Sequence, residues 1–250
     1  MKAKRNISLI LKEIFSSESK KVKIFHEEEE VVYYNKKESP RIKLIEKLFL
    51  KKKGSVLDVG CASGRESFYL AKKGFMVKGI DISKEMIYAA KKRRDREKLK
   101  NIKFEVADIS SFKERGRYDY VMALFNVLTF IPDKEKRRQA IKNIIESVKP
   151  GGRAILDVNN KFGNIRIIIK QSVFKILFML ALKERPFGDV YSNPTLPGSK
   201  AITFQHYFSK REIELILKDI TNIKYKMESV DLYTSKKDKN NMVFIIDKLK

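Results

Sequence analysis

The chain has 250 residues, of which 43% are hydrophobic and 34% are charged, and its formal net charge is +24 at pH 7. A chain of this length and apolar content can bury a sizeable core, which excludes disorder as its main state and indicates one globular domain with a small extension. The single cysteine, Cys61, excludes a disulfide scaffold or a cysteine-built zinc site, and it fits the reducing cytoplasm in which we expect the protein to work.

Two amphipathic helices, at 7–15 and 40–50, are predicted at the start of the chain, and we assign them to an N-terminal helical extension of residues 1–50. No leader-like cleavage site follows the first of them, so we expect no secretion. The remaining residues, 51–250, are expected to form the main domain, with an insertion at about 160–207.

From residue 55, short apolar runs alternate with longer amphipathic segments, which is typical of parallel strands joined by crossover helices. The predicted strands are 55–59, 76–80, 102–106, 118–124 and 153–158, and the predicted helices are 64–73, 83–99 and 133–148. The run Lys149-Pro150-Gly151-Gly152 predicts a turn that ends the third of these helices. These segments predict an α/β fold with a doubly wound, mostly parallel sheet.

The densest positive charge lies where the second of these helices ends. The basic side chains are Lys91, Lys92, Arg93, Arg94, Arg96, Lys98 and Lys100. Such a run forms either a solvated helix face or a phosphate-binding patch. Abundant lysine with only three glutamines also fits a hot habitat, so net charge alone does not identify the substrate.

The segment 165–182 is unusually apolar and lies where a simple sheet needs only a short crossover. Arg166, Lys170 and Lys175 interrupt it, and its unbroken runs fall short of the roughly 20 apolar residues that span a bilayer. We therefore expect no transmembrane helix and interpret the segment as a helical lid over the active-site mouth. A dimer surface or a peripheral membrane contact through 165–182 are the alternatives.

The last fifty residues predict a helix at 209–219, an alternating strand at 223–227, a polar loop at 235–241 and an apolar strand at 243–246. Two strands joined in this way predict an antiparallel hairpin at one end of the sheet. The turn-rich stretch 185–198 that precedes them reads as a long loop with a functional role.

The strongest chemical signal is the segment 56–64, a buried strand that runs into a turn of small residues and opens a helix. Such a turn lets the backbone approach a ligand closely. Asp81 follows Gly60 by 21 residues and ends the next strand, where an acid can accept hydrogen bonds from ribose hydroxyls. A dinucleotide site needs G-x-G-x-x-G, whereas Gly60, Ala62 and Arg65 occupy those places, so an adenosine-type ligand without a pyrophosphate is indicated.

This turn resembles the first motif, L-D-x-G-C-G-x-G, of the class I S-adenosylmethionine-dependent methyltransferases, and the resemblance extends over about residues 40–160. It implies a Rossmann-like fold with a seven-stranded sheet, S-adenosyl-L-methionine as the cofactor and no metal. Ala62 stands where the motif usually has its second glycine. The resemblance implies these cofactor-binding residues: Asp58, Gly60, Cys61, Ala62, Ser63, Gly64, Asp81, Ile82, Asp108, Ile109, Phe125 and, with Tyr33 and Tyr34 from the N-terminal extension, Arg41.

Methyl transfer from a sulfonium is a direct displacement, so an enzyme of this kind can work largely by alignment and by excluding water. Asn126 is a candidate catalytic residue beside the methyl group, and His206 is a candidate proton acceptor. We expect a small-molecule or lipid-like acceptor. The alternatives are an RNA methyltransferase acting on a tRNA or cap-like substrate, which the charge of +24 suggests, and a non-catalytic S-adenosylmethionine-binding module.

Overall fold

The computed structural model describes residues 52–180, 188–192, 203–229 and 239–250. The predicted helices at 7–15 and 40–50 lie outside these residues, as do Tyr33, Tyr34 and Arg41. The N-terminal extension therefore stays a prediction.

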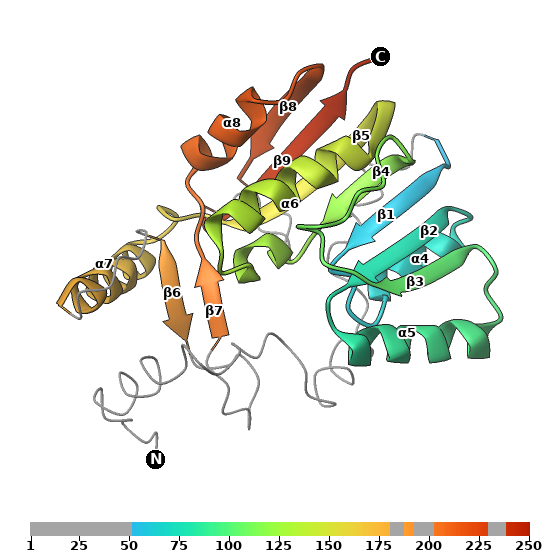
Figure 1. Ribbon diagram of the computed structural model, residues 1–250, viewed down its shortest axis with the longest axis horizontal. Coiled ribbons are helices and arrows are strands. Elements are labelled where there is room, and N and C mark those ends of the chain that lie inside the picture. Colours follow the sequence, from blue (N-terminus) through green and yellow to red (C-terminus); the bar gives the residue numbers. More distant parts are fainter. Residues whose placement is uncertain (1–51, 181–187, 193–202, 230–238) are drawn as a thin grey trace.

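A seven-stranded sheet forms the centre of the molecule (Figure 1). Its strands are β1 (Ser55–Val59), β2 (Met76–Asp81), β3 (Ile102–Val106), β4 (Tyr118–Ala123), β5 (Val148–Asn159), β8 (Ile223–Glu228) and β9 (Asn241–Lys248). They are ordered β3-β2-β1-β4-β5-β9-β8. The first five are parallel, and β9 is antiparallel to both β5 and β8. The predicted parallel sheet with an antiparallel C-terminal hairpin is confirmed.

Polar side chains cap three of the helices close to their predicted starts. The helices are α4 (Arg65–Lys72), α5 (Lys84–Glu97), α6 (Lys134–Ser147), α7 (Ile165–Leu180) and α8 (Lys210–Lys218), with a short 3-10 helix, η1 (Val127–Phe130). Ser83, Asp133 and Ser209 each precede a helix and accept a hydrogen bond from the backbone N–H three residues later. Each cap satisfies a donor that the first turn leaves without an intrahelical partner.

Two hydrophobic layers hold the helices to the two faces of the sheet. Consecutive residues of β1 point to opposite faces, so Leu57 packs in the same layer as Ile141 of α6, while Val56 packs in the same layer as Phe68 of α4. All four side chains are essentially inaccessible to solvent. Helices on both faces explain why the parallel strands read as continuous apolar runs.

The third predicted helix ends before Lys149 as expected, but the predicted turn at 149–152 is wrong, because β5 already begins at Val148 and runs through these residues. The backbone of Val148 is extended directly after α6, and it pairs with Tyr118. Gly151 takes a φ of 80°, and the register of β4 and β5 shifts between Tyr118 and Tyr120. A local irregularity thus accommodates proline and glycine within the strand, where they would otherwise end it.

The stretch that reads as a long loop contributes to a two-stranded antiparallel sheet, formed by β6 (Asp189–Ser192) and β7 (Thr203–His206). Each strand has four residues, which is too short for a clear alternating pattern in the sequence. The described residues of the predicted insertion form α7 and the hairpin of β6 and β7. Among the residues that the structure describes, no helix is long and apolar enough to cross a membrane.

Truncating a central core side chain is expected to destabilise the fold. Leu57→Ala removes a fully buried side chain and should lower the free energy of unfolding by about 2–5 kcal/mol in urea denaturation. The matched control is Leu215→Ala on α8, where the leucine is 52% exposed and the change should stay within about 0.5 kcal/mol. An equal decrease in the free energy of unfolding for the two variants would contradict the assignment of Leu57 to the core.

Candidate functional site

A cavity of about 860 Å³ lies where the carboxyl ends of β1, β2 and β4 meet. Open α/β sheets bind ligands at this edge. Ten predicted site residues line it: Gly60, Cys61, Ala62, Ser63, Asp81, Ile82, Asp108, Ile109, Phe125 and Asn126. Asp58 of β1 and Gly64, the residue before α4, do not line the cavity. Segments far apart in the sequence thus form one site.

The turn after β1 is held tightly against β2. The backbone N–H groups of Gly60 and Cys61 both donate to the carbonyl of Ile80, at 2.8 and 3.0 Å. Gly60 has a φ of 68°, and a Cβ there would approach Cγ2 of Val127 to 2.2 Å. Ala62 takes a φ of 46°, a left-handed conformation that costs a non-glycine residue about 1–2 kcal/mol. This conformation explains why the resembled motif usually has glycine at that position.

The carboxylate of Asp81 joins two turns. One of its oxygens accepts from the backbone N–H of Ala62 at 2.8 Å, and the other accepts from the backbone N–H of Ser83 at 2.9 Å. The first N–H belongs to the turn after β1, and the second belongs to the residue that caps α5. Asp81 therefore sets the relative position of the two turns that line one half of the cavity.

Asp58 lies behind the cavity and has a raised pKa. Burial, with the neighbouring carboxylates Glu66 and Asp81, raises the pKa of Asp58 to about 8, although the hydroxyl of Ser67 donates to it at 2.5 Å. The buried carboxyl is thus largely protonated at neutral pH in the free protein. A cation bound nearby would favour the charged form and lower this pKa.

The turn after β4 is strained. Phe125 and Asn126 both have positive φ, at 62° and 59°, although neither is glycine. The backbone N–H of Phe125 donates to Asp157 at 2.8 Å, and Asp157, at the end of β5, is fully buried. Strain of this kind persists where the surrounding structure enforces it, and it clusters at functional sites.

Two buried polar atoms at the cavity wall, Oγ of Ser63 and Oδ1 of Asn126, have no hydrogen-bond partner within the described part of the chain. Buried polar atoms in native proteins are nearly always paired, so these two are suited to a ligand. Together with the small-residue turn and the raised pKa of Asp58, they fit a ligand that carries hydroxyls and a cationic group. No group of three or more His, Cys, Asp or Glu residues in the described ranges could hold a metal ion.

Sequence reasoning missed several residues of the site. Arg65 pairs with Glu66 at 2.9 Å, and its guanidinium lies 4.6 Å from the ring centre of Phe125. Both charged residues line the cavity. Their position directly after the turn at 60–64 was the feature of the sequence that could have indicated this. Gln205 of β7 also lines the cavity, and the hydroxyl of Tyr207 donates to its Oε1 at 3.3 Å. No local pattern indicates Gln205, because the hairpin itself was not predicted.

His206, the expected proton acceptor, does not line the cavity. It is 1% exposed, and its Nδ1 and Nε2 lie 2.6 Å from Asp189 and 2.9 Å from Glu212. Burial disfavours the charged form of Glu212, but the hydrogen bond with His206 and the charges of Lys161 and Arg137 together lower its pKa. With a carboxylate at each ring nitrogen, His206 is placed to hold β7 against α8 rather than to accept a proton from a substrate.

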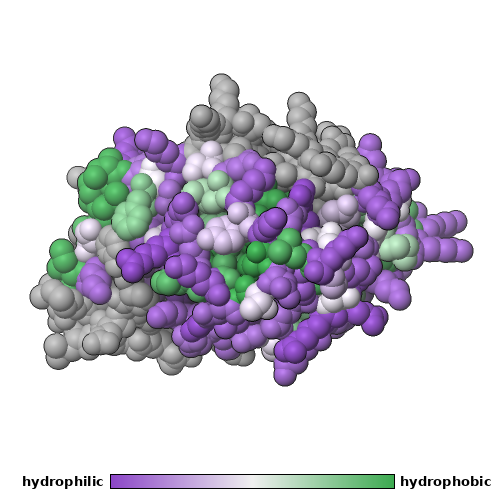
Figure 2. Space-filling view, turned by 90° about the horizontal axis from the view of Figure 1, so that it is seen from above, coloured by the Kyte–Doolittle hydropathy of each residue, from purple (hydrophilic) through white to green (hydrophobic). Residues whose placement is uncertain are grey.

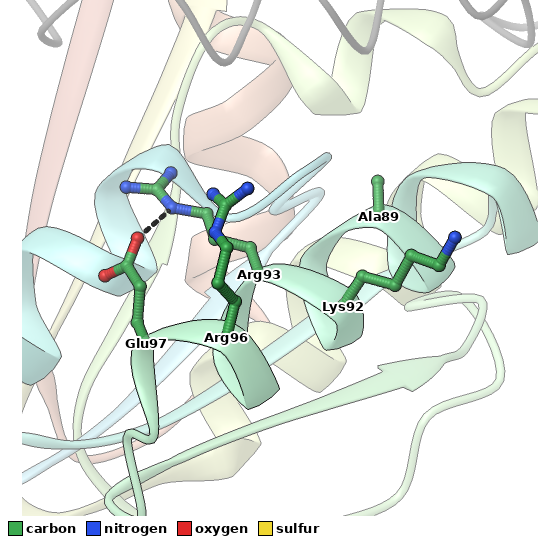
Figure 3. A pocket seen from close by; sticks show the side chains of 5 residues that line it. All are labelled: Ala89, Lys92, Arg93, Arg96 and Glu97. Atoms are coloured by element: carbon green, nitrogen blue, oxygen red, sulfur yellow. Dashed lines mark hydrogen bonds and ion pairs between the residues drawn. The ribbon is translucent and has the colours of Figure 1, made fainter.

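The basic cluster lies on the second half of α5 and just beyond its end, whereas the start of this helix lines the cavity. Figure 3 shows Lys92, Arg93 and Arg96 on one stretch of this helix, with Arg93 paired to Glu97 at 2.7 Å. The guanidinium of Arg93 also lies 4.1 Å from the ring centre of Phe68. Because α5 has 14 residues, its C-terminal end is about 20 Å from the cavity-lining Ser83.

Residues 50–184 match a family model described as a methyltransferase domain. Over 122 residues, the chain is 35% identical to a ubiquinone biosynthesis O-methyltransferase from Coxiella burnetii, an alignment that covers 48% of this chain and 50% of the relative. The chain thus spans about half the length of the curated relatives it matches first.

Solved structures share the fold. An S-adenosylmethionine-dependent methyltransferase from Methanosarcina mazei has a TM-score of 0.64 and 25% identity, over 82% of this chain and 97% of that one. The methyltransferase CcbJ from Streptomyces caelestis has a TM-score of 0.65 at 14% identity, over 88% of this chain and 96% of that one, which shows the fold alone.

The raised pKa of Asp58 predicts a pH-dependent stability. The carboxyl ionises near its ordinary value of 3.8 in the unfolded chain but only near pH 8 in the folded one, so its contribution to stability is lost as the pH rises from about 4 to about 8. Asp58→Asn keeps the shape without the ionisation and should lack this decrease in urea denaturation. Asp95→Asn on the surface of α5 should follow the unmodified protein. Parallel pH curves for all three proteins would refute the assignment.

Proposed function

Because the chain belongs to the S-adenosylmethionine-dependent methyltransferase family, whose model covers more than half of its residues, we propose that it transfers a methyl group from S-adenosyl-L-methionine to a small-molecule or lipid-like acceptor. The observation that carries the proposal is the composition of the cavity. One half has polar turns around Asp81, and the other half has the apolar residues of η1 with two amide side chains.

The polar half suits the cofactor. We assign Asp81 to the ribose hydroxyls, since each oxygen of a carboxylate can accept a further hydrogen bond beside the backbone N–H it already binds. Ser63 offers a hydroxyl that has no hydrogen-bond partner among the described residues, and Ile82 and Ile109 offer apolar surface beside it. Asp58 supplies negative charge behind the turn once it ionises. When bound, S-adenosylmethionine supplies an electrophilic methyl group on its sulfonium.

The apolar half suits the acceptor. Val127, Phe130, Ile131 and Pro132 line it, and such a wall excludes water from the reacting atoms. Oδ1 of Asn126, buried and without a partner among the described residues, can accept a hydrogen bond from the acceptor and orient its nucleophilic atom. Alignment of this kind supplies much of the rate in a displacement reaction, so no dedicated base is required of His206.

Two observations favour a small acceptor over RNA. The cationic groups at the C-terminal end of α5 partly neutralise or stack within the protein, and that end lies far from the cavity. The Coxiella relative, by its name, is an O-methyltransferase of ubiquinone biosynthesis and not of RNA. The same cavity also argues against a non-catalytic binding module, because its apolar half has room beyond the cofactor turns.

Label transfer tests this proposal directly. The purified protein is incubated with methyl-labelled S-adenosylmethionine and a cell extract separated into RNA, protein, lipid and small-metabolite fractions. Label in the lipid or metabolite fraction, unaffected by nuclease, is the expected result. Nuclease-sensitive label in the RNA fraction would overturn the choice of acceptor, and label in no fraction despite cofactor binding would favour a binding module.

Asp81→Asn is expected to weaken S-adenosylmethionine binding about 10- to 100-fold in titration calorimetry, because a charged hydrogen-bond acceptor contributes about 1.5–3 kcal/mol. Part of the loss comes from the released N–H groups of Ala62 and Ser83. Asp95→Asn, at the far end of α5, is the matched control and should bind normally. Unchanged affinity in Asp81→Asn would remove Asp81 from the cofactor site.

The variant Gln205→Ala tests the acceptor half of the cavity independently of the cofactor half. It should lower kcat/KM for the identified acceptor about tenfold by removing one hydrogen-bonding group, while S-adenosylmethionine affinity stays constant. Gln139→Ala, on α6 and outside the cavity lining, is the matched control. If Gln205→Ala instead lost cofactor affinity while the acceptor kinetics stayed unchanged, Gln205 would belong to the cofactor half, which would contradict this assignment.

A further inference from the structure

An apolar stripe runs along the exposed side of α7. Ile165, Ile169, Val173 and Ile176 are between 49% and 66% exposed. At about 100° per residue, these four side chains fall within an arc of about 80° on the helix. Gln171, on the opposite side, is buried and donates to the carbonyl of Lys161. The helix therefore packs on the protein by one side and presents the stripe outward.

The stripe forms part of a larger hydrophobic surface at one end of the molecule. Phe162, just before the helix, is also exposed, at 58%. Figure 2 shows hydrophobic side chains gathered at the end that α7 occupies in Figure 1, bordered by hydrophilic ones. A contiguous exposed apolar patch on a protein usually marks an interaction site.

Positive charge flanks the stripe. The exposed side chains of Arg166 and Lys175 lie on its two sides by helical spacing. From residue 158 to residue 183 the sequence has no Asp or Glu, and its basic residues are Lys161, Arg166, Lys170, Lys175 and Lys183. An apolar helix face with basic flanks has the pattern of helices that lie in the interface of a membrane.

From this arrangement we propose that α7 is a peripheral membrane-binding helix, which inserts the stripe of Ile165, Ile169, Val173 and Ile176 into the surface of an anionic phospholipid bilayer. Charge decides between the possible occupants. A second copy would bring together two chains that each have a net charge of +24, which like-charge repulsion opposes. An anionic lipid surface attracts the same charges. The inference goes beyond the proposed function and does not depend on the identity of the acceptor.

Vesicle sedimentation with the full chain tests the proposal. The protein is expected to sediment with vesicles of mixed phosphatidylglycerol and phosphatidylcholine, and more weakly with phosphatidylcholine alone. Replacing Ile169 and Val173 together by glutamate should weaken binding to the anionic vesicles about tenfold or more, because apolar burial is lost and negative charge is added. Leu215→Glu, a matched exposed position on α8, should leave binding unchanged.

A second variant tests the role of charge. Replacing Arg166 and Lys175 together by glutamine should reduce the preference for anionic over neutral vesicles, because two of the charges that flank the stripe are lost. Equal sedimentation of the protein and both variants, or no sedimentation at all, would overturn the proposal. A concentration-dependent dimer that the Ile169 and Val173 variant disrupts, without vesicle binding, would overturn it in favour of a second copy.

The thermal shift with S-adenosylmethionine separates this proposal from the proposed function. The stripe lies outside the cavity lining, so all variants should retain the shift if they are folded. An absent shift in the unmodified protein would count against the proposed function. The vesicle assay would still test the membrane-binding role of α7, because it does not depend on cofactor binding.

Discussion

The carboxylate of Asp81 is the interaction on which the site depends. It accepts one backbone N–H from the turn after β1 and another from the residue that caps α5. Parallel strands bring their carboxyl ends to one edge of the sheet, but that alone does not fix the turns relative to each other. Asp81 fixes them, and the carbonyl of Ile80 accepts two further backbone N–H groups of the first turn. The strained conformation of Ala62 is maintained within this frame.

The cavity joins two chemically different halves, and each is supported by groups that do not enter it. Asp58 lies behind the polar half, and Asp157 holds the turn at Phe125 that separates the halves. On the apolar side, β7 brings Gln205 to the wall while His206, next in the chain, faces the other way between two carboxylates. Alternation along a strand thus assigns one residue to the cavity and its neighbour to the buried charge cluster.

The parts of this structure that sequence could predict are those with strong local patterns. The parallel strands, the capped helices and the turn from Gly60 to Gly64 each depend on residues close together in the chain. The start of β5 was mispredicted because proline and glycine normally interrupt a strand, whereas here a register shift accommodates them. The role of His206 could not be predicted, because its partner Asp189 reaches it through a hairpin of two very short strands. Gln205 was missed for the same reason.

The most direct test of the central claim is amide hydrogen exchange with and without S-adenosylhomocysteine, the product form of the cofactor. The account predicts slower exchange in segments 60–67, 81–86 and 124–128, where the turns around the cavity would be held by the ligand. Exchange at 91–97, the basic end of α5, should not change. Slowing confined to 91–97, or no slowing at the three turns, would contradict the account.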